Sequence, residues 1–171
     1  MLRIILNRLK PQTEKIIAEE HSGFRARRST TEQIFNLQIL YGNISSTSNT
    51  STMSFIDLKK AFDRVWHAAL WATTKKYISA NFIRVIKDLY DKATSAVLLN
   101  SSIGDWFRTT VGVRLGCLLS PTLFNIFLER IMTDALEDHD GTVSIAGRTI
   151  TKFRFADDID SLAGEEEELA K

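Results

Sequence analysis

The residues of this sequence best suited to chemistry are acidic side chains that follow apolar runs. Asp157 and Asp158 come directly after an apolar segment that ends in Ala156, and Asp57 closes the apolar run 53–56. A carboxylate in an apolar setting either takes up a proton or binds a cation. Several that converge form a site for a hard divalent metal ion. The pattern therefore predicts a metal site suited to phosphoryl transfer, with a turn shaped by Asp157 and Asp158 as the alternative.

Composition is that of an ordinary globular protein, with 171 residues, 44% hydrophobic and 25% charged. Lys and Arg number 22 against 21 Asp and Glu, so the net charge of +1 indicates no overall basic excess. Arg25, Arg27 and Arg28 nevertheless form a local basic cluster. Such a patch near carboxylates can bind a polyanion without a high isoelectric point. A solvated charged surface is the alternative.

Cellular context is indicated by what the sequence lacks. Cys117 is the only cysteine, so an intramolecular disulfide is excluded and a reducing compartment fits. No apolar run approaches the roughly 20 residues that span a bilayer. Arg3 interrupts the first apolar residues too early for a signal peptide. We expect a soluble intracellular chain, in the nucleus or the cytoplasm, with no membrane partner.

Periodicity and turn signals predict the elements that would position the carboxylates. Helices are expected in four regions: 2–20 (with a kink at Pro11 and core positions that include Ile4), a helix capped by Ser29, 61–92 in two pieces, and a buried helix from Ser120. Strands are expected at 53–58 (fully buried), at 96–99 paired with 106–111, and at 142–145 paired with 148–155. With no repeat or linker, the pattern predicts one α+β domain of helices packed on a small antiparallel sheet.

Four sequence blocks in a fixed order carry a family resemblance over essentially the whole chain. The blocks are 22–25 with 27–30, 55–63, 112–121 continuing to 123–125, and 155–158. Together they resemble the reverse transcriptase domain of non-LTR (LINE-type) retrotransposons. The resemblance implies a partial reverse transcriptase domain over 1–171, with a fingers-like segment at 1–52, mainly palm at 53–171, and no thumb.

This resemblance implies an RNA-directed DNA polymerase. Asp57 and Asp157 would be its two metal-holding carboxylates, and Asp158, the second acid of the pair, would complete the catalytic and metal-binding set. Such sites hold two Mg²⁺ ions, or Mn²⁺ in their place, about 3.5–4 Å apart. The partners implied are an RNA template, a DNA primer and dNTPs, and no protein partner is indicated.

Further roles also follow from the resemblance. Phe62 would stack under the incoming sugar and exclude a 2′-hydroxyl, with a core phenylalanine as the alternative. Arg25, Arg27 and Arg28 would approach triphosphate or template phosphates, which guanidinium groups match well. The site residues toward dNTP or template would also include Arg114, Leu115, Gly116 and Asn125. For Asn125, helix capping or core hydrogen bonding is an equal alternative.

One departure from the family pattern concerns activity. Leu115 stands where the family usually carries Gln, and a lost polar contact costs about 1–3 kcal/mol. Because the sequence also ends soon after Asp158, we expect a fingers–palm fragment with weak or no polymerase activity in isolation. The alternative function is an inactive retrotransposon remnant that binds nucleic acid weakly at most. A metal-dependent nuclease or nucleotidyl cyclase would leave the block 112–121 unexplained.

Overall fold

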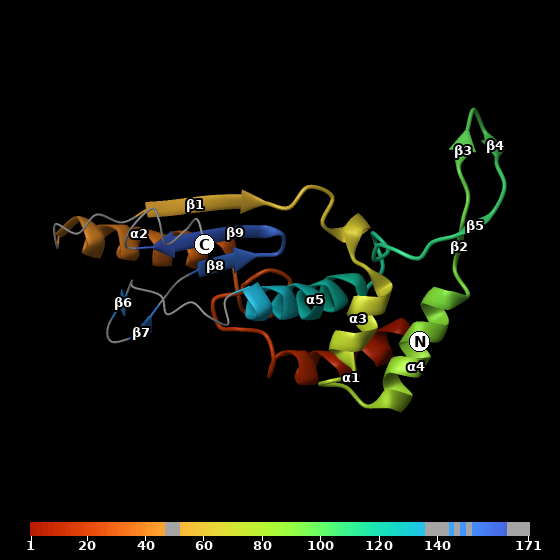
Figure 1. The fold of residues 1–171 in the computed structure, drawn as a ribbon, viewed down its shortest axis with the longest axis horizontal. Helices are drawn as coiled ribbons and strands as arrows, with labels where there is room; N and C mark the ends of the chain where they lie inside the picture. Colours follow the sequence, from red (N-terminus) through yellow and green to blue (C-terminus); the bar gives the residue numbers. More distant parts are fainter. Residues whose placement is uncertain (47–51, 136–143, 146–147, 150–151, 164–171) are drawn as a thin grey trace. The chain divides into compact units, whose positions relative to one another are not determined.

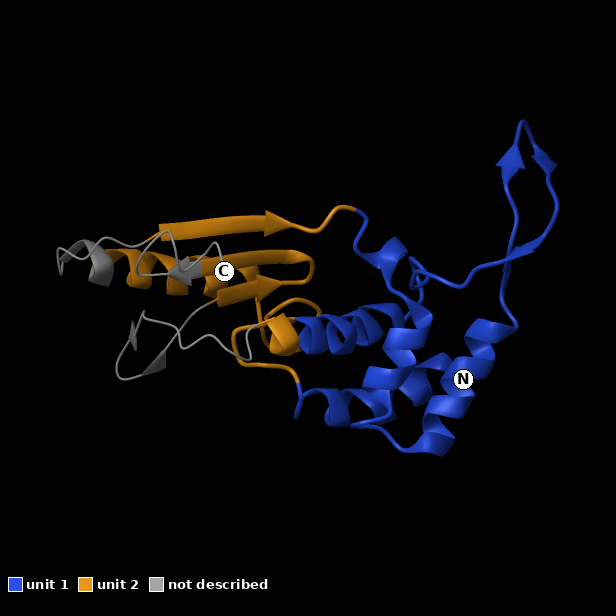
Figure 2. Ribbon diagram, in the orientation of Figure 1, with its two compact units in different colours: residues 1–16, 60–131 blue, residues 17–59, 132–171 orange. Residues whose placement is uncertain are grey.

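The computed structural model describes residues 1–46, 52–135, 144–145, 148–149 and 152–163. The chain divides into two units, each assembled from separate stretches of sequence (Figure 2). Unit 1 comprises residues 1–16 and 60–131, and unit 2 comprises residues 17–59 and 132–171. The predicted fingers-like segment 1–52 and palm segment 53–171 follow different boundaries, and that assignment stays a prediction.

Unit 1 is mainly helical (Figure 1). Its helices are α1 (Leu2–Thr13), the 3₁₀ turn η1 (Phe62–Arg64), α3 (His67–Thr74), α4 (Ala80–Asp91) and α5 (Ser120–Ala135), whose last residues enter unit 2. The helix predicted to reach residue 20 ends at Thr13, two residues after Pro11. Pro11 thus lies inside the helix, and the residues 14–16 that follow it form a turn.

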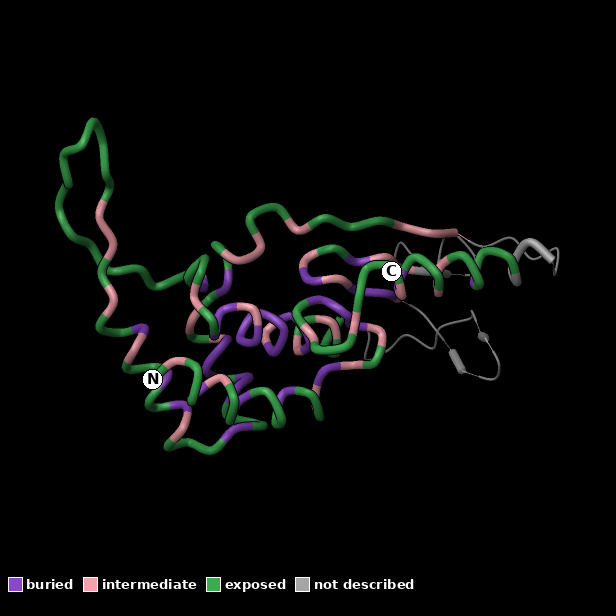
Figure 3. Tube along the Cα trace, turned by 180° about the vertical axis from the view of Figure 1, so that it is seen from behind, coloured by how far each residue is buried: buried purple, intermediate pink, exposed green. Residues whose placement is uncertain are grey.

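The core of unit 1 is formed by the apolar faces of α1, α4 and α5. Helix α5 is buried along most of its first ten residues, as Figure 3 shows by its colour. The other buried side chains include Ile5 and Leu9 of α1 and Ile83 and Ile86 of α4. Ile4, which was expected in the core, is exposed. The predicted buried helix after Ser120 is confirmed.

An exposed β-arm leaves unit 1 between α4 and α5 (Figure 3). It consists of β2 (Thr94–Ser95) paired with β5 (Phe107–Arg108) and β3 (Leu98–Leu99) paired with β4 (Ser102–Ile103). The predicted pairing of 96–99 with 106–111 was therefore wrong in register. Asn100 and Ser101 both have positive φ angles, of 47° and 64°, which build a two-residue turn rather than the longer loop that was expected.

Unit 2 contains the three-stranded antiparallel sheet, in the order β1-β9-β8. Its strands are β1 (Thr52–Asp57), β8 (Lys152–Phe155) and β9 (Asp158–Ala163). A separate hairpin pairs β6 (Ser144–Ile145) with β7 (Arg148–Thr149). The strand predicted over 148–155 is thus two strands, because β7 pairs with β6 whereas β8 pairs with β9.

Strand β1 corrects a second expectation. It was predicted to be fully buried, yet Phe55 is 70% exposed and Ile56 is 44% exposed. Within the described ranges β1 pairs with β9 alone, so it is an edge strand of its sheet. A short apolar run does not distinguish an edge strand from a central one, and burial here follows the position in the sheet.

Helix α2 (Thr30–Ser46) completes unit 2 and begins as its capping signal predicts. The Ser29 hydroxyl accepts a hydrogen bond of 3.2 Å from the backbone N–H of Glu32. The predicted α+β class is confirmed by helices and small antiparallel sheets together. No helix within the described residues is long and apolar enough to cross a membrane.

Candidate active site

Two of the predicted site carboxylates lie opposite each other in the sheet. Asp57, the last residue of β1, is the register partner of Asp158, the first residue of β9. Directly opposed residues of an antiparallel pair have Cβ atoms about 4.5–5.5 Å apart and project from the same face. Residues from distant parts of the chain are therefore brought together at one end of the sheet in unit 2.

Asp157 lies in the tight turn between β8 and β9. Because Phe155 pairs with Asp158, Ala156 and Asp157 are the two residues of that turn. Ala156 has a φ angle of +58°, which for a residue with a side chain costs of order 1–2 kcal/mol. A two-residue hairpin loop with positive φ at its first position suits the twist of the flanking strands. The turn places Asp157 beside the pair formed by Asp57 and Asp158.

The electrostatics of this end of the sheet reflect accumulated negative charge. Desolvation raises the pKa of Asp158 above its ordinary value, and the charges of Asp157 and Asp57 raise it further. Desolvation also raises the pKa of Asp160, with a second contribution from Asp158. The neighbouring charges thus disfavour ionisation of Asp158 and Asp160, and a bound cation would reverse that effect.

These carboxylates have the donor chemistry that Mg²⁺ prefers. Within the described ranges, no set of three or more His, Cys, Asp or Glu side chains is gathered closely enough to hold a metal ion. Mg²⁺, however, is usually bound through one or two carboxylates together with waters and substrate phosphates. The opposed Asp57 and Asp158, with Asp157 adjacent, fit that open kind of site rather than a closed protein cage.

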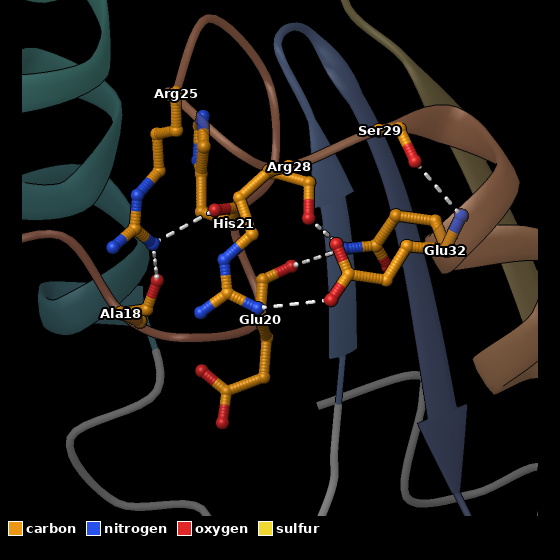
Figure 4. Close-up of polar contacts among 9 residues, drawn as sticks. Ala18, Glu20, His21, Arg25, Arg28, Ser29 and Glu32 are labelled. Carbon is orange, nitrogen blue, oxygen red and sulfur yellow. Dashed lines mark hydrogen bonds and ion pairs between the residues drawn. The ribbon is translucent and has the colours of Figure 1, made fainter.

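The basic cluster of Arg25, Arg27 and Arg28 lies in the loop before α2, also in unit 2. The side chains of Arg25 and Arg28 form polar contacts with other residues of the chain (Figure 4). The Arg25 guanidinium donates from Nη1 to the backbone carbonyls of Ala18 and His21, at 2.6 and 2.9 Å. Arg28 forms an ion pair of 3.4 Å with Glu32. Arg27 is exposed. Contact of these arginines with phosphate stays a prediction, and Arg27 is the member whose position suits it best.

The remaining candidates belong to unit 1. The ring of Phe62 stacks on that of Phe124 in α5, with centroids 4.4 Å apart and planes 14° apart. This contact is the one that the core alternative for Phe62 requires, and the ring remains only half-buried. Asn125 is buried in α5, as its core alternative requires. Substrate roles for both residues stay predictions.

The glycine-bracketed loop that precedes α5 begins close to η1. Gly112 and Gly116 have φ angles of +86° and +79°, as expected for glycines placed there for backbone freedom. A Cβ on Gly112 would lie 3.0 Å from the carbonyl oxygen of Asp63. The backbone N–H of Gly112 donates to Val65, and that of Val113 donates to Phe62, both at 2.8 Å.

The middle of this loop presents one apolar side chain to solvent. Leu115 is 75% exposed, and nothing lies within 4 Å of a Cβ built on Gly116. The preceding Arg114 is held to α4, where it donates to the carbonyl of Leu89 at 2.7 Å and lies over the ring of Tyr90. The loop is therefore anchored on the N-terminal side of Leu115, through Gly112, Val113 and Arg114.

Comparison with known protein families shows to which family the chain belongs. The family described as reverse transcriptase (RNA-dependent DNA polymerase) matches residues 1–171, the whole chain. The protein belongs to the reverse transcriptase family. The predicted resemblance to non-LTR retrotransposon reverse transcriptases is likewise confirmed by the relatives that it matches.

Those relatives are RNA-directed DNA polymerases of mobile elements. The reverse transcriptase chain is 33% identical over 127 residues to the probable RNA-directed DNA polymerase from transposon BS of Drosophila melanogaster, covering 73% of this chain and 14% of the relative. It is 27% identical over 159 residues to the polymerase from mobile element jockey of Drosophila funebris, covering 92% and 17%. The chain thus spans less than a fifth of either relative.

Solved structures agree on the fold of this reverse transcriptase chain. Apo telomerase from Candida tropicalis superposes with a TM-score of 0.75 at 15% identity, over 99% of this chain and 33% of that one. Telomerase from Candida albicans in complex with a telomeric RNA fragment gives a TM-score of 0.66 at 12% identity, over 99% and 30%. At such identities the likeness establishes the fold alone.

In each unit, one residue that supports candidate site residues was missed by sequence reasoning. His67 was assigned no role, yet its Nε2 lies 2.7 Å from the carbonyl oxygen of Gly112 and helps to hold the loop before α5. Gly23 was placed in the sequence block 22–25 without a role of its own, yet it packs against the turn that carries Asp157. Neither contact has a local sequence signal, because each joins residues far apart in the chain.

Proposed function

We propose that this chain carries the catalytic centre of a non-LTR retrotransposon reverse transcriptase. The reaction would be nucleotidyl transfer from a dNTP to a primer 3′-hydroxyl, directed by an RNA template. The observation that carries the proposal is the pairing of Asp57 with Asp158, with Asp157 in the adjoining turn. Membership of the reverse transcriptase family supports the same assignment.

In this reaction the primer 3′-oxygen attacks the α-phosphorus, its proton is lost, and the bond to the β-phosphate oxygen breaks to release pyrophosphate. Two bound Mg²⁺ ions, or Mn²⁺, would lower the pKa of the 3′-hydroxyl and neutralise the triphosphate and the leaving pyrophosphate. Asp57 and Asp157 would hold these ions through carboxylate oxygens, and Asp158 would add negative charge beside them. The carboxylates thus orient the site and are not consumed.

Basic residues would bind the polyanionic template and primer. Arg27 is exposed, and a guanidinium group can form two parallel hydrogen bonds with a phosphate. Each phosphate neutralised by such a residue releases counterions, so binding should weaken as salt is raised. The RNA template, DNA primer and dNTPs are part of this proposal, as is a location in the nucleus or the cytoplasm.

A second candidate function is that of an inactive remnant that binds nucleic acid weakly. The observation that favours it is Leu115, an exposed apolar side chain where the family resemblance leads one to expect Gln. Leucine can neither donate nor accept a hydrogen bond to template or nucleotide. The two candidate functions differ in whether a bound primer is extended.

Single-turnover extension of a DNA primer on an RNA template, with Mg²⁺, dNTPs and excess protein, tests the proposal. We expect weak extension by the unaltered chain, none by Asp157→Asn, and extension equal to that of the unaltered chain by the control Asp91→Asn, whose exposed side chain lies on α4. Mobility-shift measurement of primer–template binding accompanies each reaction. Binding without extension by a folded, unaltered chain would instead support the remnant.

A further inference from the structure

Gly23 lies directly against the backbone of the carboxylate turn. A Cβ added to Gly23 would lie 2.1 Å from the backbone nitrogen of Ala156, 2.7 Å from its Cα and 3.0 Å from the carbonyl carbon of Phe155. Separations below 3.0 Å are sterically forbidden, and backbone atoms cannot move aside as a flexible side-chain end can. Only glycine therefore allows the chain at position 23 to approach the turn this closely.

The segment around Gly23 is hydrogen-bonded to β8 through an isolated parallel bridge. The backbone N–H of Ser22 donates to the carbonyl of Arg154 at 2.8 Å, and the N–H of Arg154 donates to the carbonyl of Glu20 at 3.1 Å. His21 forms a parallel bridge with Arg154. We call residues 20–25 the brace, since they flank β8 on the edge that β9 does not occupy.

Side chains hold the brace in its own conformation (Figure 4). Arg25 donates hydrogen bonds to the carbonyls of Ala18 and His21, which closes the chain into a tight loop around Gly23. Gln33, near the start of α2, donates to the carbonyl of Glu20 at 3.3 Å and to the hydroxyl of Ser22. The brace is thus fastened at both ends and in the middle.

We propose that Gly23 is a positioning residue that sets the location of Asp157 and Asp158 relative to Asp57, an inference that rests on the proposed function. The turn is held from two directions: Asp158 pairs with Asp57 through β9, and Ala156 is packed against Gly23. A side chain at position 23 would displace the turn and separate the carboxylates. The contacts on both sides of Ala156 hold its backbone at a positive φ angle, which is unfavourable for a residue with a side chain.

The experiment compares two glycine-to-alanine variants of the full chain. Gly23→Ala introduces the clash, whereas Gly42→Ala, in α2 of the same unit, places its Cβ where nothing lies within 4 Å. Amide ¹H–¹⁵N shifts report movement of the backbone, and electron paramagnetic resonance reports binding of Mn²⁺ alone. We expect Gly23→Ala to shift the amides of residues 155–158 and 57 and to weaken Mn²⁺ binding about tenfold or more, as loss of outer-shell support does at metal sites.

Gly42→Ala should change neither signal. A folded Gly23→Ala protein whose turn amides and Mn²⁺ affinity match those of the unaltered chain would overturn the inference. If Gly23→Ala fails to fold, Arg25→Met replaces it, because it loosens the brace by removing the hydrogen bonds to Ala18 and His21 without adding a clash. Turn amides that shift in this variant support the inference, and amides that stay in place overturn it.

These readouts also separate the inference from the proposed function. Movement of the turn and loss of Mn²⁺ binding in Gly23→Ala support a positioning role whether or not the chain extends a primer. An unaltered chain that binds Mn²⁺ yet never extends a primer contradicts the proposed function alone. Unmoved turn amides contradict the inference alone.

Discussion

Asp57 and Asp158 are direct partners across the β1–β9 pair, although a hundred positions of sequence separate them. Two like charges at facing positions of a sheet destabilise it, and Asp157 in the adjoining turn adds a third. Desolvation and these two neighbours together raise the pKa of Asp158. This arrangement of carboxylates is unfavourable without a cation, and a bound divalent metal ion would stabilise it.

The raised pKa of Asp158 predicts how stability depends on pH in the absence of metal. Between the ordinary carboxyl pKa, about 4, and the raised value, the folded chain holds a proton that the unfolded chain has lost. The folded state binds more protons there, so the free energy of unfolding falls as pH rises through this window. Because Asp158 is exposed, solvent screens the effect and the slope should be modest.

Urea denaturation in a chelator, from about pH 4 to about pH 6, measures this slope. Asp158→Asn should reduce it, while Asp91→Asn on α4 should leave it unchanged. A slope that is the same in Asp158→Asn and in the unaltered chain would show that the pKa of Asp158 is not raised in the folded chain.

Arg25 and Arg27 are predicted to act differently although they lie in the same loop. Arg25→Met should lower the free energy of unfolding by about 1–3 kcal/mol, because it removes two hydrogen bonds to backbone carbonyls from a charged donor. Arg27→Met, at an exposed position, should leave stability within about 0.5 kcal/mol. It should instead weaken RNA binding and reduce the salt slope of the binding constant by about 1. Equal stability losses in both variants would contradict the assignment.

Phe62 should influence both stability and sugar selection. Phe62→Ala removes the ring stacked on Phe124 and should cost about 1–3 kcal/mol. If Phe62 also excludes a 2′-hydroxyl, the variant should use ribonucleotides about tenfold better relative to dNTPs. Phe124→Leu is the matched control, since it disturbs the same ring pair without touching the predicted sugar site. Sugar preference that changes equally in both variants would indicate that Phe62 acts through the core alone.

Leu115→Gln should raise activity without affecting the fold. Leu115 is 75% exposed, so the substitution should change the free energy of unfolding by no more than about 0.5 kcal/mol. If an amide there contacts template or nucleotide, extension should increase about tenfold to a hundredfold. Leu118→Gln, at another exposed position of the same loop, serves as control. Equal extension by Leu115→Gln and the unaltered chain would remove Leu115 as the explanation of any weak activity.

Much of the carboxylate end of unit 2 was predictable from sequence, because its signals are local. An apolar run that ends in an acid marked Asp57 and the adjacent Asp157 and Asp158, and Ser29 marked the start of α2. Strand pairing was less predictable. The turn at Asn100 and Ser101 depends on positive φ angles of residues that carry side chains, which a search for glycine does not find.

Contacts between segments that are far apart in the sequence could not be predicted. The exposure of Phe55 follows from the edge position of β1, and an apolar run looks the same at an edge and in the centre of a sheet. The sequence shows a glycine at position 23 but not why it is needed. The reason is the close approach of the backbone of Ala156, which leaves no space for a Cβ atom. Packing between segments therefore decided which residues support the carboxylates.

Single-nucleotide incorporation followed by rapid quench, on an RNA-templated primer with Mg²⁺, tests the central claim most directly. The unaltered chain is compared with Asp57→Asn, which keeps the size of the side chain and removes the charge opposite Asp158. We predict incorporation by the unaltered chain and its loss by at least about a hundredfold in Asp57→Asn, with circular dichroism unchanged. Incorporation at the same rate by a folded Asp57→Asn protein would contradict the claim that these carboxylates form the catalytic centre.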